Sequence, residues 1–170
     1  MGLSGESTDV RGTSDERTYL RHLLATIAYR GGKVLRDAPE GFGSVSAGEG
    51  SRTAVQILAH LGDLFAWGLA LAEGEHRWSD TEGDDWEGQL ERFFAGIAAV
   101  DARLASFEPL GRPALGLVQG PFADSLTHIG QIAMLRRLAG SPVRGENYYK
   151  AKIEVGRVGR DQAPSVVEFD

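Results

Sequence analysis

Residues 52–73 read RTAVQILAHLGDLFAWGLALAE, a stretch in which apolar side chains recur every three or four positions. This spacing places them along one face of an α-helix. Ser51 is the expected N-cap, and Gly74 is expected to close the helix in the left-handed conformation that glycine tolerates. The apolar face consists of Ala54, Ile57, Leu58, Leu61, Phe65 and Leu69.

Three further stretches show the same helical period, and each is bounded by residues that begin or end helices. Ser14 is the expected cap of the first, in which the pair Gly31-Gly32 weakens the pattern and would permit a kink. Pro121 fits only a first turn, so the last helix is expected to begin close to it. The expected helices are about Asp15–Asp37, Asp84–Phe107 and Gln119–Ala139. Asp84 and Glu87 stand at capping-box spacing.

Four helices without a convincing run of strands predict an all-α protein, a four-helix bundle with an irregular C-terminal tail. We expect a flexible N-terminus at residues 1–14, the bundle at 15–140, and a tail packed on the bundle at 141–170. Within the tail, Ile153-Glu154-Val155 alternates weakly and is expected to be extended. No repeat or shift in composition indicates a second domain.

The composition excludes several classes of function. The formal net charge of −6 argues against a nucleic-acid partner, because phosphate backbones require a basic face, and it gives no reason to expect binding to anionic membranes. Met1–Arg17 lacks the apolar core of a signal peptide, and no apolar run approaches the roughly 20 residues of a membrane span. We therefore expect a cytoplasmic protein. The chain has no cysteine, so a thiol in any reaction must come from a cosubstrate.

The last predicted helix carries a pair of residues suited to binding a metal. Asp124 and His128 are one helical turn apart and project from nearly the same face. A carboxylate and an imidazole suit zinc, iron, nickel or manganese. His60 is the best candidate for a third ligand, because it lies mid-helix beside the apolar face and can point into the bundle. Asp63 is a candidate outer partner, alternative ligand or general base, and Gln131 borders the same face as His128.

An ordinary interpretation of the same residues is also open. An Asp/His pair at this spacing can be a surface pair that stabilises a helix by a few tenths of a kcal/mol. His60 can be a partly buried histidine that serves no ligand role. The remaining histidines, His22 and His76, look ordinary, although the loop that holds His76 could overhang a site.

The segment Asp124-Ser-Leu-Thr-His128-Ile-Gly-Gln131-Ile-Ala-Met-Leu-Arg-Arg-Leu138 resembles the last helix of the DinB-like (DinB/YfiT) family. His60-Leu-Gly-Asp63-Leu-Phe-Ala-Trp67 resembles its second-helix segment, and the likeness covers about residues 15–140. The resemblance implies a four-helix bundle, often dimeric, in which three histidines bind one divalent metal. His60 and His128 match two of these positions, and Asp124 stands where the family more often has its remaining histidine. We expect a mixed site of two histidines and one carboxylate.

Three functions remain open from the sequence. Some DinB-like proteins are thiol-dependent transferases or isomerases, and here the metal would stabilise the thiolate of a low-molecular-weight cosubstrate; a metal-activated water performing hydrolysis is a related option. A second is a non-catalytic metal-binding protein with a stress-related or regulatory role. The third is a plain helical dimer without metal. The sequence does not decide whether the protein is an enzyme, and no catalytic residue is assigned.

Overall fold

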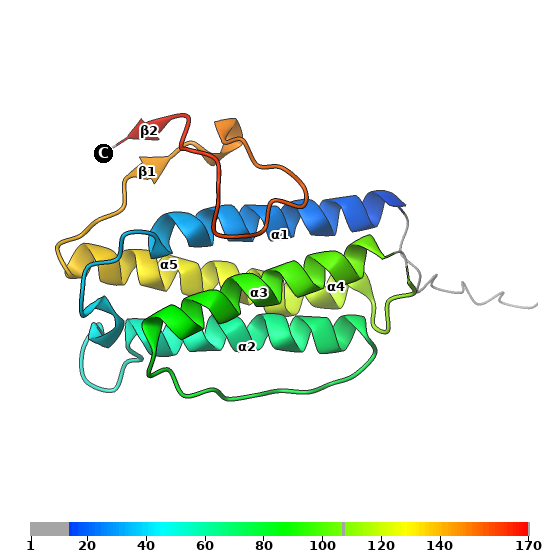
Figure 1. Cartoon of the computed structure of the whole chain (residues 1–170), viewed down its shortest axis with the longest axis horizontal. Coiled ribbons are helices and arrows are strands. Elements are labelled where there is room, and N and C mark those ends of the chain that lie inside the picture. The colour runs from blue at the N-terminus through cyan, green and yellow to red at the C-terminus, as the bar shows by residue number, and fades with distance from the viewer. Residues whose placement is uncertain (1–13, 107, 170) are drawn as a thin grey trace, which may run out of the picture.

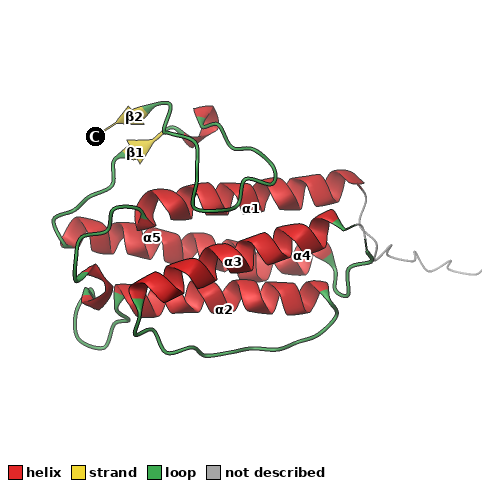
Figure 2. Cartoon of the chain, in the orientation of Figure 1, coloured by secondary structure: helices red, strands yellow, loops and turns green. Residues whose placement is uncertain are grey.

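The structure, a computed structural model of the chain, describes residues 14–106 and 108–169. Long helical rods lie side by side, and irregular segments join them (Figures 1 and 2). Three rods are single helices: α1 (Ser14–Leu35), α2 (Ala54–Ala72) and α3 (Trp86–Ala105). The fourth consists of α4 (Ala114–Leu117), a π-helical turn (Val118–Phe122) and α5 (Ala123–Leu138). The predicted all-α four-helix bundle is confirmed. The predicted flexible N-terminus lies outside the described residues, apart from the backbone of Ser14.

The rods do not simply alternate in direction. The connection 73–85 runs back along α2, so α3 begins at the same end of the bundle as α2 (Figure 1). α2 packs against α3, and α5 packs against both α1 and α2. The long connection contacts α2 at two places. The Thr81 backbone donates a hydrogen bond to Asp63, and Gly83 lies so close to the backbone of Val55 that a side chain there would collide with it.

The core fills the space between the four rods and receives large side chains from each of them. Burying one Leu or Phe side chain stabilises the fold by about 1.5–3 kcal/mol, so this interior is the main source of stability. Phe65, Phe93 and Phe94 are buried in this core, whereas Trp67 is only partly buried. Fully buried side chains from the four rods include Leu24, Phe65, Phe93, Ile97 and Phe122.

Helix α2 begins later than predicted, and its N-cap is Thr53 rather than Ser51. Thr53 is extended, with φ −75° and ψ 164°, and its hydroxyl accepts a hydrogen bond from the Gln56 backbone. Gln56 returns a bond to the Thr53 backbone, which completes a capping box. A backbone bridge between Ser46 and Thr53 keeps the preceding residues extended, which is why the helix cannot start at Arg52. Gly74 closes the helix with φ +93°, as predicted.

By length and composition alone, α2 is the one helix among the described residues that could cross a membrane, contrary to the expectation from the sequence. In the fold, 67% of that apolar window is buried inside the bundle. This is weak evidence for a span, because the core helix of a soluble bundle passes the same test.

The fourth rod starts earlier than predicted, and Pro121 lies inside it rather than in its first turn. α4 begins at Ala114, and the π-helical turn accommodates the proline. Gly120 has φ −89° and ψ −106°, which breaks the helical path where Pro121 supplies no N–H. Residues 114–118, just before Gln119, extend the rod because α4 packs against α2.

Two smaller corrections concern helix starts and the glycine pair. Asp85, not Asp84, caps α3, and its carboxylate accepts from the Gly88 backbone. Gly31 and Gly32 do not interrupt α1. Instead, a Cβ on Gly31 would lie 2.8 Å from the ring of Phe93, so the absent side chain is what lets α1 approach α3 closely.

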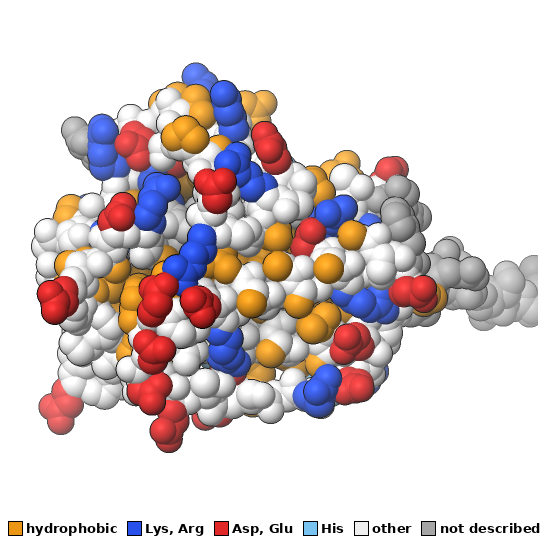
Figure 3. All heavy atoms as spheres, viewed as in Figure 1, with side chains coloured by type: hydrophobic (Ala, Val, Ile, Leu, Met, Phe, Trp, Pro, Cys, Tyr) orange, Lys and Arg blue, Asp and Glu red, His pale blue; other side chains and the backbone are white. Residues whose placement is uncertain are grey.

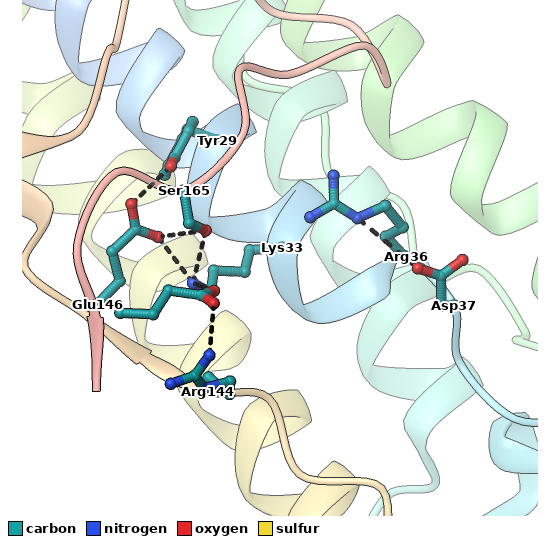
Figure 4. A network of polar contacts seen from close by, with 8 residues as sticks. Tyr29, Lys33, Arg36, Asp37, Arg144, Glu146 and Ser165 are labelled. Atoms are coloured by element: carbon teal, nitrogen blue, oxygen red, sulfur yellow. Dashed lines mark hydrogen bonds and ion pairs between the residues drawn. The ribbon is translucent and has the colours of Figure 1, made fainter. Parts of the chain in front are cut away.

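The C-terminal tail lies along α1 and is fastened to it by buried polar contacts (Figures 1 and 4). Lys33 of α1 bonds Glu146 at 2.8 Å and Glu168 at 2.7 Å, and the hydroxyl of Tyr29 donates to Glu146 at 2.7 Å. These two glutamates belong to the short antiparallel strands β1 (Gly145–Glu146) and β2 (Glu168–Phe169). Residues 153–155, expected to be extended, contain no strand.

Candidate metal centre

Helix α5 presents Asp124 and His128 toward α2 from adjacent turns of one helix face. The His128 Nε2 atom lies 3.4 Å from an Asp124 carboxylate oxygen. Just before these residues, the ring of Pro121 rests on Gly68 of α2, with Pro121 atoms 3.4 Å from where a Cβ would stand. The small Gly68 therefore lets the start of α5 come close to α2.

Helix α2 supplies His60 to the same place. Its Nε2 atom lies 3.6 Å from the other carboxylate oxygen of Asp124, and its ring centroid lies 4.5 Å from that of His128. One ligand atom from each of the three residues lies within 4.8 Å of the other two. The structure thus brings together all three residues that the sequence singles out, and this cluster could hold a metal ion.

The spacing of the donor atoms suits a metal better than direct hydrogen bonds. Metal–nitrogen and metal–oxygen bonds of about 2.0–2.2 Å in a tetrahedral site place neighbouring ligand atoms about 3.3–3.6 Å apart. The distances from Asp124 to His60 and His128, 3.6 and 3.4 Å, agree with that spacing. Both exceed the 2.7–3.2 Å of an ordinary hydrogen bond. Two imidazoles and one carboxylate are also a competent donor set for a divalent ion.

Gln131 makes a hydrogen bond with the ring of His128. The Nδ1 atom of His128 lies 2.8 Å from Gln131 Oε1, which can only accept a hydrogen bond. The contact therefore favours the neutral tautomer with its proton on Nδ1, in which the lone pair of Nε2 faces Asp124. This is how an outer partner commonly holds a ligand histidine in the tautomer that a metal needs. The sequence indicated only that Gln131 borders the same face as His128.

His60 is held in its neutral form. Burial lowers the pKa of His60, electrostatic interactions with His128 and Arg52 lower it further, and Asp124 opposes these effects without reversing them. Its Nδ1 atom is buried and makes no hydrogen bond to the described residues. A neutral imidazole does not form a true ion pair with Asp124, and it offers a lone pair to a metal.

The loop between α2 and α3 does overhang the cluster, through a residue that the sequence did not single out. The ring of Trp78 lies 5.5 Å from the ring of His60 and 5.9 Å from that of Trp67. Trp78 lies in an irregular loop without periodicity, so no pattern in the sequence predicts this contact. His76 from the same loop packs on Trp67 rather than joining the cluster. His22 is exposed on α1.

Asp63 is not a ligand, an outer partner of the cluster or a free base. The carboxylate accepts hydrogen bonds from the Thr81 backbone at 2.9 Å and from the Thr81 hydroxyl at 2.7 Å, and it forms an ion pair with Arg92. Its side chain is almost completely buried. Because these partners occupy both oxygens, Asp63 anchors the overhanging loop instead of acting on a metal.

Two cavities border the cluster, one on each side of Arg52. A cavity of about 510 Å³ reaches His60 and is lined by Arg52, Gln56 and the acidic loop 80–84. A second, of about 450 Å³, reaches His128, and most of its lining surface is apolar. The cluster is open to solvent between them, since the Asp124 side chain is 46% exposed whereas His60 and His128 are each 13% exposed. The arrangement offers a ligand access to the open side of the three donors.

Comparison of the chain with protein-family models, with curated proteins and with solved structures gives no match. The likeness to the DinB-like family is therefore carried only by the two segments quoted from the sequence. Any functional conclusion has to be argued from the geometry of the cluster and its surroundings.

Proposed function

We propose that His60, Asp124 and His128 bind one divalent metal ion, as a mixed version of the DinB-like site. One observation carries the proposal: side chains from α2 and α5, distant in sequence, place three donor atoms within 4.8 Å of one another. The neutral state of His60 and the tautomer of His128 support it, because both leave imidazole lone pairs for a metal. Zinc, nickel, iron and manganese all suit this donor set.

The proposed activity is that of a metal-dependent transferase or isomerase that uses a low-molecular-weight thiol. Bound to these residues, a divalent ion would lower the pKa of a thiol and hold its thiolate. His60 and His128 would orient the ion, and the exposed side of Asp124 leaves room for the thiol to approach. With an epoxide as electrophile, an S–C bond forms, a C–O bond breaks, and the thiol proton ends on the ring oxygen. The absence of cysteine supports an external thiol.

The alternative is a non-catalytic metal-binding or stress-related protein. The cluster joins α2 to α5, so an ion there would also cross-link two helices of the bundle. A homodimer, implied by the family resemblance, is proposed for either function, and light scattering on the purified protein would detect it.

Elemental analysis tests the metal site directly. Protein purified without a nickel column should contain close to one divalent ion per chain. Asp124→Ala and His128→Ala should each lower metal affinity at least about tenfold, because each removes a donor from a site with only three. His22→Ala is the matched control, since His22 is exposed and outside the cluster. Unchanged affinity in both cluster variants would show that the site is wrong.

Thiol chemistry needs a separate measurement. Cobalt-loaded protein should develop a sulfur-to-cobalt charge-transfer band when a small thiol is added. Turnover of an epoxide or of maleylpyruvate should then depend on the thiol and disappear in His60→Ala. Metal binding without a charge-transfer band or turnover, with each of the common thiols, would favour the non-catalytic alternative.

A further inference from the structure

The cavity next to His128, which we name the Arg52 cavity, has an apolar wall and one permanent charge. Its apolar wall comes from Ala47, Ile57, Met134 and Leu135, and its polar lining residues are Ser51, Arg52, His128 and Gln131. The volume of about 450 Å³ lies in the range of small-molecule sites. Because His128 reaches the metal cluster, a molecule held in this cavity would have one end beside the proposed ion.

Arg52 has unused binding capacity. Within the described part of the chain, its guanidinium makes no hydrogen bond and no ion pair, although Arg52 is close enough to lower the pKa of His60. Arg52 directly precedes Thr53, the N-cap residue of α2. A guanidinium presents paired N–H donors that match the two oxygens of a carboxylate.

The other side of Arg52 is unsuitable for an anion. There the larger cavity is lined by Asp80, Glu82 and Asp84, and Figure 3 shows acidic side chains gathered around the start of α3. The loop that carries these carboxylates is held in place by the bonds from Thr81 to Asp63. An anion would be repelled on that side, so it would reach Arg52 from the apolar side.

We propose that the Arg52 cavity binds an apolar carboxylate, with the carboxylate on Arg52 and the apolar body against Ile57, Met134 and Leu135. This inference deepens the proposed function, on which it rests for the reaction, by naming the substrate class: an electrophile that carries a carboxylate on an apolar skeleton. Arg52 binds and orients this molecule. The proposal gives Arg52 no part in bond making.

The test compares 4-phenylbutyrate with its uncharged counterpart 4-phenylbutyramide by isothermal titration calorimetry. Both ligands are titrated into the parent protein, Arg52→Gln and Arg137→Gln, in metal-free and zinc-loaded forms. The parent should bind the acid about 10- to 100-fold more tightly than the amide, as expected for charge-assisted hydrogen bonds. Arg52→Gln should abolish this preference. Arg137→Gln should keep it, because Arg137 is exposed on α5 and lines neither cavity.

A second variant tests the apolar wall. Met134 is 57% exposed, so Met134→Glu should fold, and its new carboxylate should weaken binding of the acid more than binding of the amide. Equal affinities for acid and amide in the parent, no binding to the parent in either form, or an unchanged preference in Arg52→Gln would each overturn the proposal.

The metal-free measurements separate this inference from the metal site. A carboxylate can coordinate zinc directly, so a preference that appears only in the zinc-loaded protein and survives in Arg52→Gln would be due to the ion and would count against the proposal. A preference that depends on Arg52 in metal-free protein supports the cavity even if Asp124→Ala shows that the metal site is wrong.

Discussion

At the scale of single residues, metal binding by His60 and His128 depends on which of their ring nitrogen atoms carry protons. His128 donates from Nδ1 to Gln131, and burial keeps His60 neutral. Asp124 then faces two imidazole nitrogens at distances longer than hydrogen bonds. A cation bound between these three side chains would take up the imidazole lone pairs and the carboxylate charge together.

Replacing Gln131 tests whether this outer contact serves the metal. We expect Gln131→Leu to lower metal affinity about 10- to 100-fold while leaving one ion per chain at saturation, because loss of an outer partner frees the ligand ring. Competition with a chromophoric chelator measures the affinity. Gln119→Leu is the control, as Gln119 is an exposed glutamine before α5 that lines neither cavity beside the cluster. Equal affinities in the two variants would mean that Gln131 does not orient His128.

At the scale of the helices, glycine residues, which have no side chain, allow two helices to approach closely. Gly31 faces the buried ring of Phe93 in α3, whereas Gly130 on α5 has nothing within 4 Å of where its Cβ would stand. Both glycines lie inside α-helices, so they differ in packing rather than in local conformation.

Alanine at these two positions should therefore have opposite effects on stability. We expect Gly31→Ala to lower the free energy of unfolding by about 1–3 kcal/mol, because overpacking against Phe93 outweighs the gain in helix propensity. Gly130→Ala should raise it by about 0.5–1 kcal/mol. Urea unfolding followed by circular dichroism measures both. Stabilisation of similar size in the two variants would show that α1 and α3 are not closely packed at Gly31.

At the scale of the whole molecule, an ion pair between two buried side chains, Lys33 of α1 and Glu146 of the tail, joins the tail to the bundle. Burial tends to raise the pKa of Glu146, but hydrogen bonds from Lys33, Tyr29 and Ser165 outweigh burial and lower it overall. For Lys33, burial tends to lower the pKa, and bonds to Glu146 and Glu168 outweigh burial and raise it.

These opposite shifts define a pH range for the stabilisation by this pair. A carboxyl with a lowered pKa stabilises the fold above its unfolded pKa of about 4.3, and that contribution is lost as the pH falls through the folded value. The contribution of Lys33 is complete below about pH 10.4 and is lost as the pH rises through its raised folded pKa.

Melting temperatures of the parent and of the double variant Lys33→Met/Glu146→Leu should therefore run parallel between about pH 5 and pH 9. Below about pH 4 the melting temperature of the parent should fall more steeply. The test uses the shape of the two curves and not the difference in melting temperature at neutral pH, because apolar residues can replace a buried ion pair at little cost in stability. Curves that stay parallel down to pH 2 would contradict the assigned role of Glu146.

Local patterns in the sequence were enough to predict the bundle and seven of its eight helix ends to within two residues. Apolar periodicity predicts α2 because a helix with one apolar face has to bury it. Asp124 and His128 were paired from the sequence because helix geometry alone brings residues one turn apart together. The N-cap of α2 and the start of the fourth rod were wrong, because contacts made across the fold decide both.

What only the tertiary structure decided lies between the helices. The approach of His60 to Asp124, the contact of Trp78 with His60, and the commitment of Asp63 to Thr81 all join residues from different elements. Their side-chain directions depend on how α2, α5 and the loop pack, which no local period encodes. The sequence by itself determined which residues can bind a metal, and the packing of α2 against α5 decided that three of them meet.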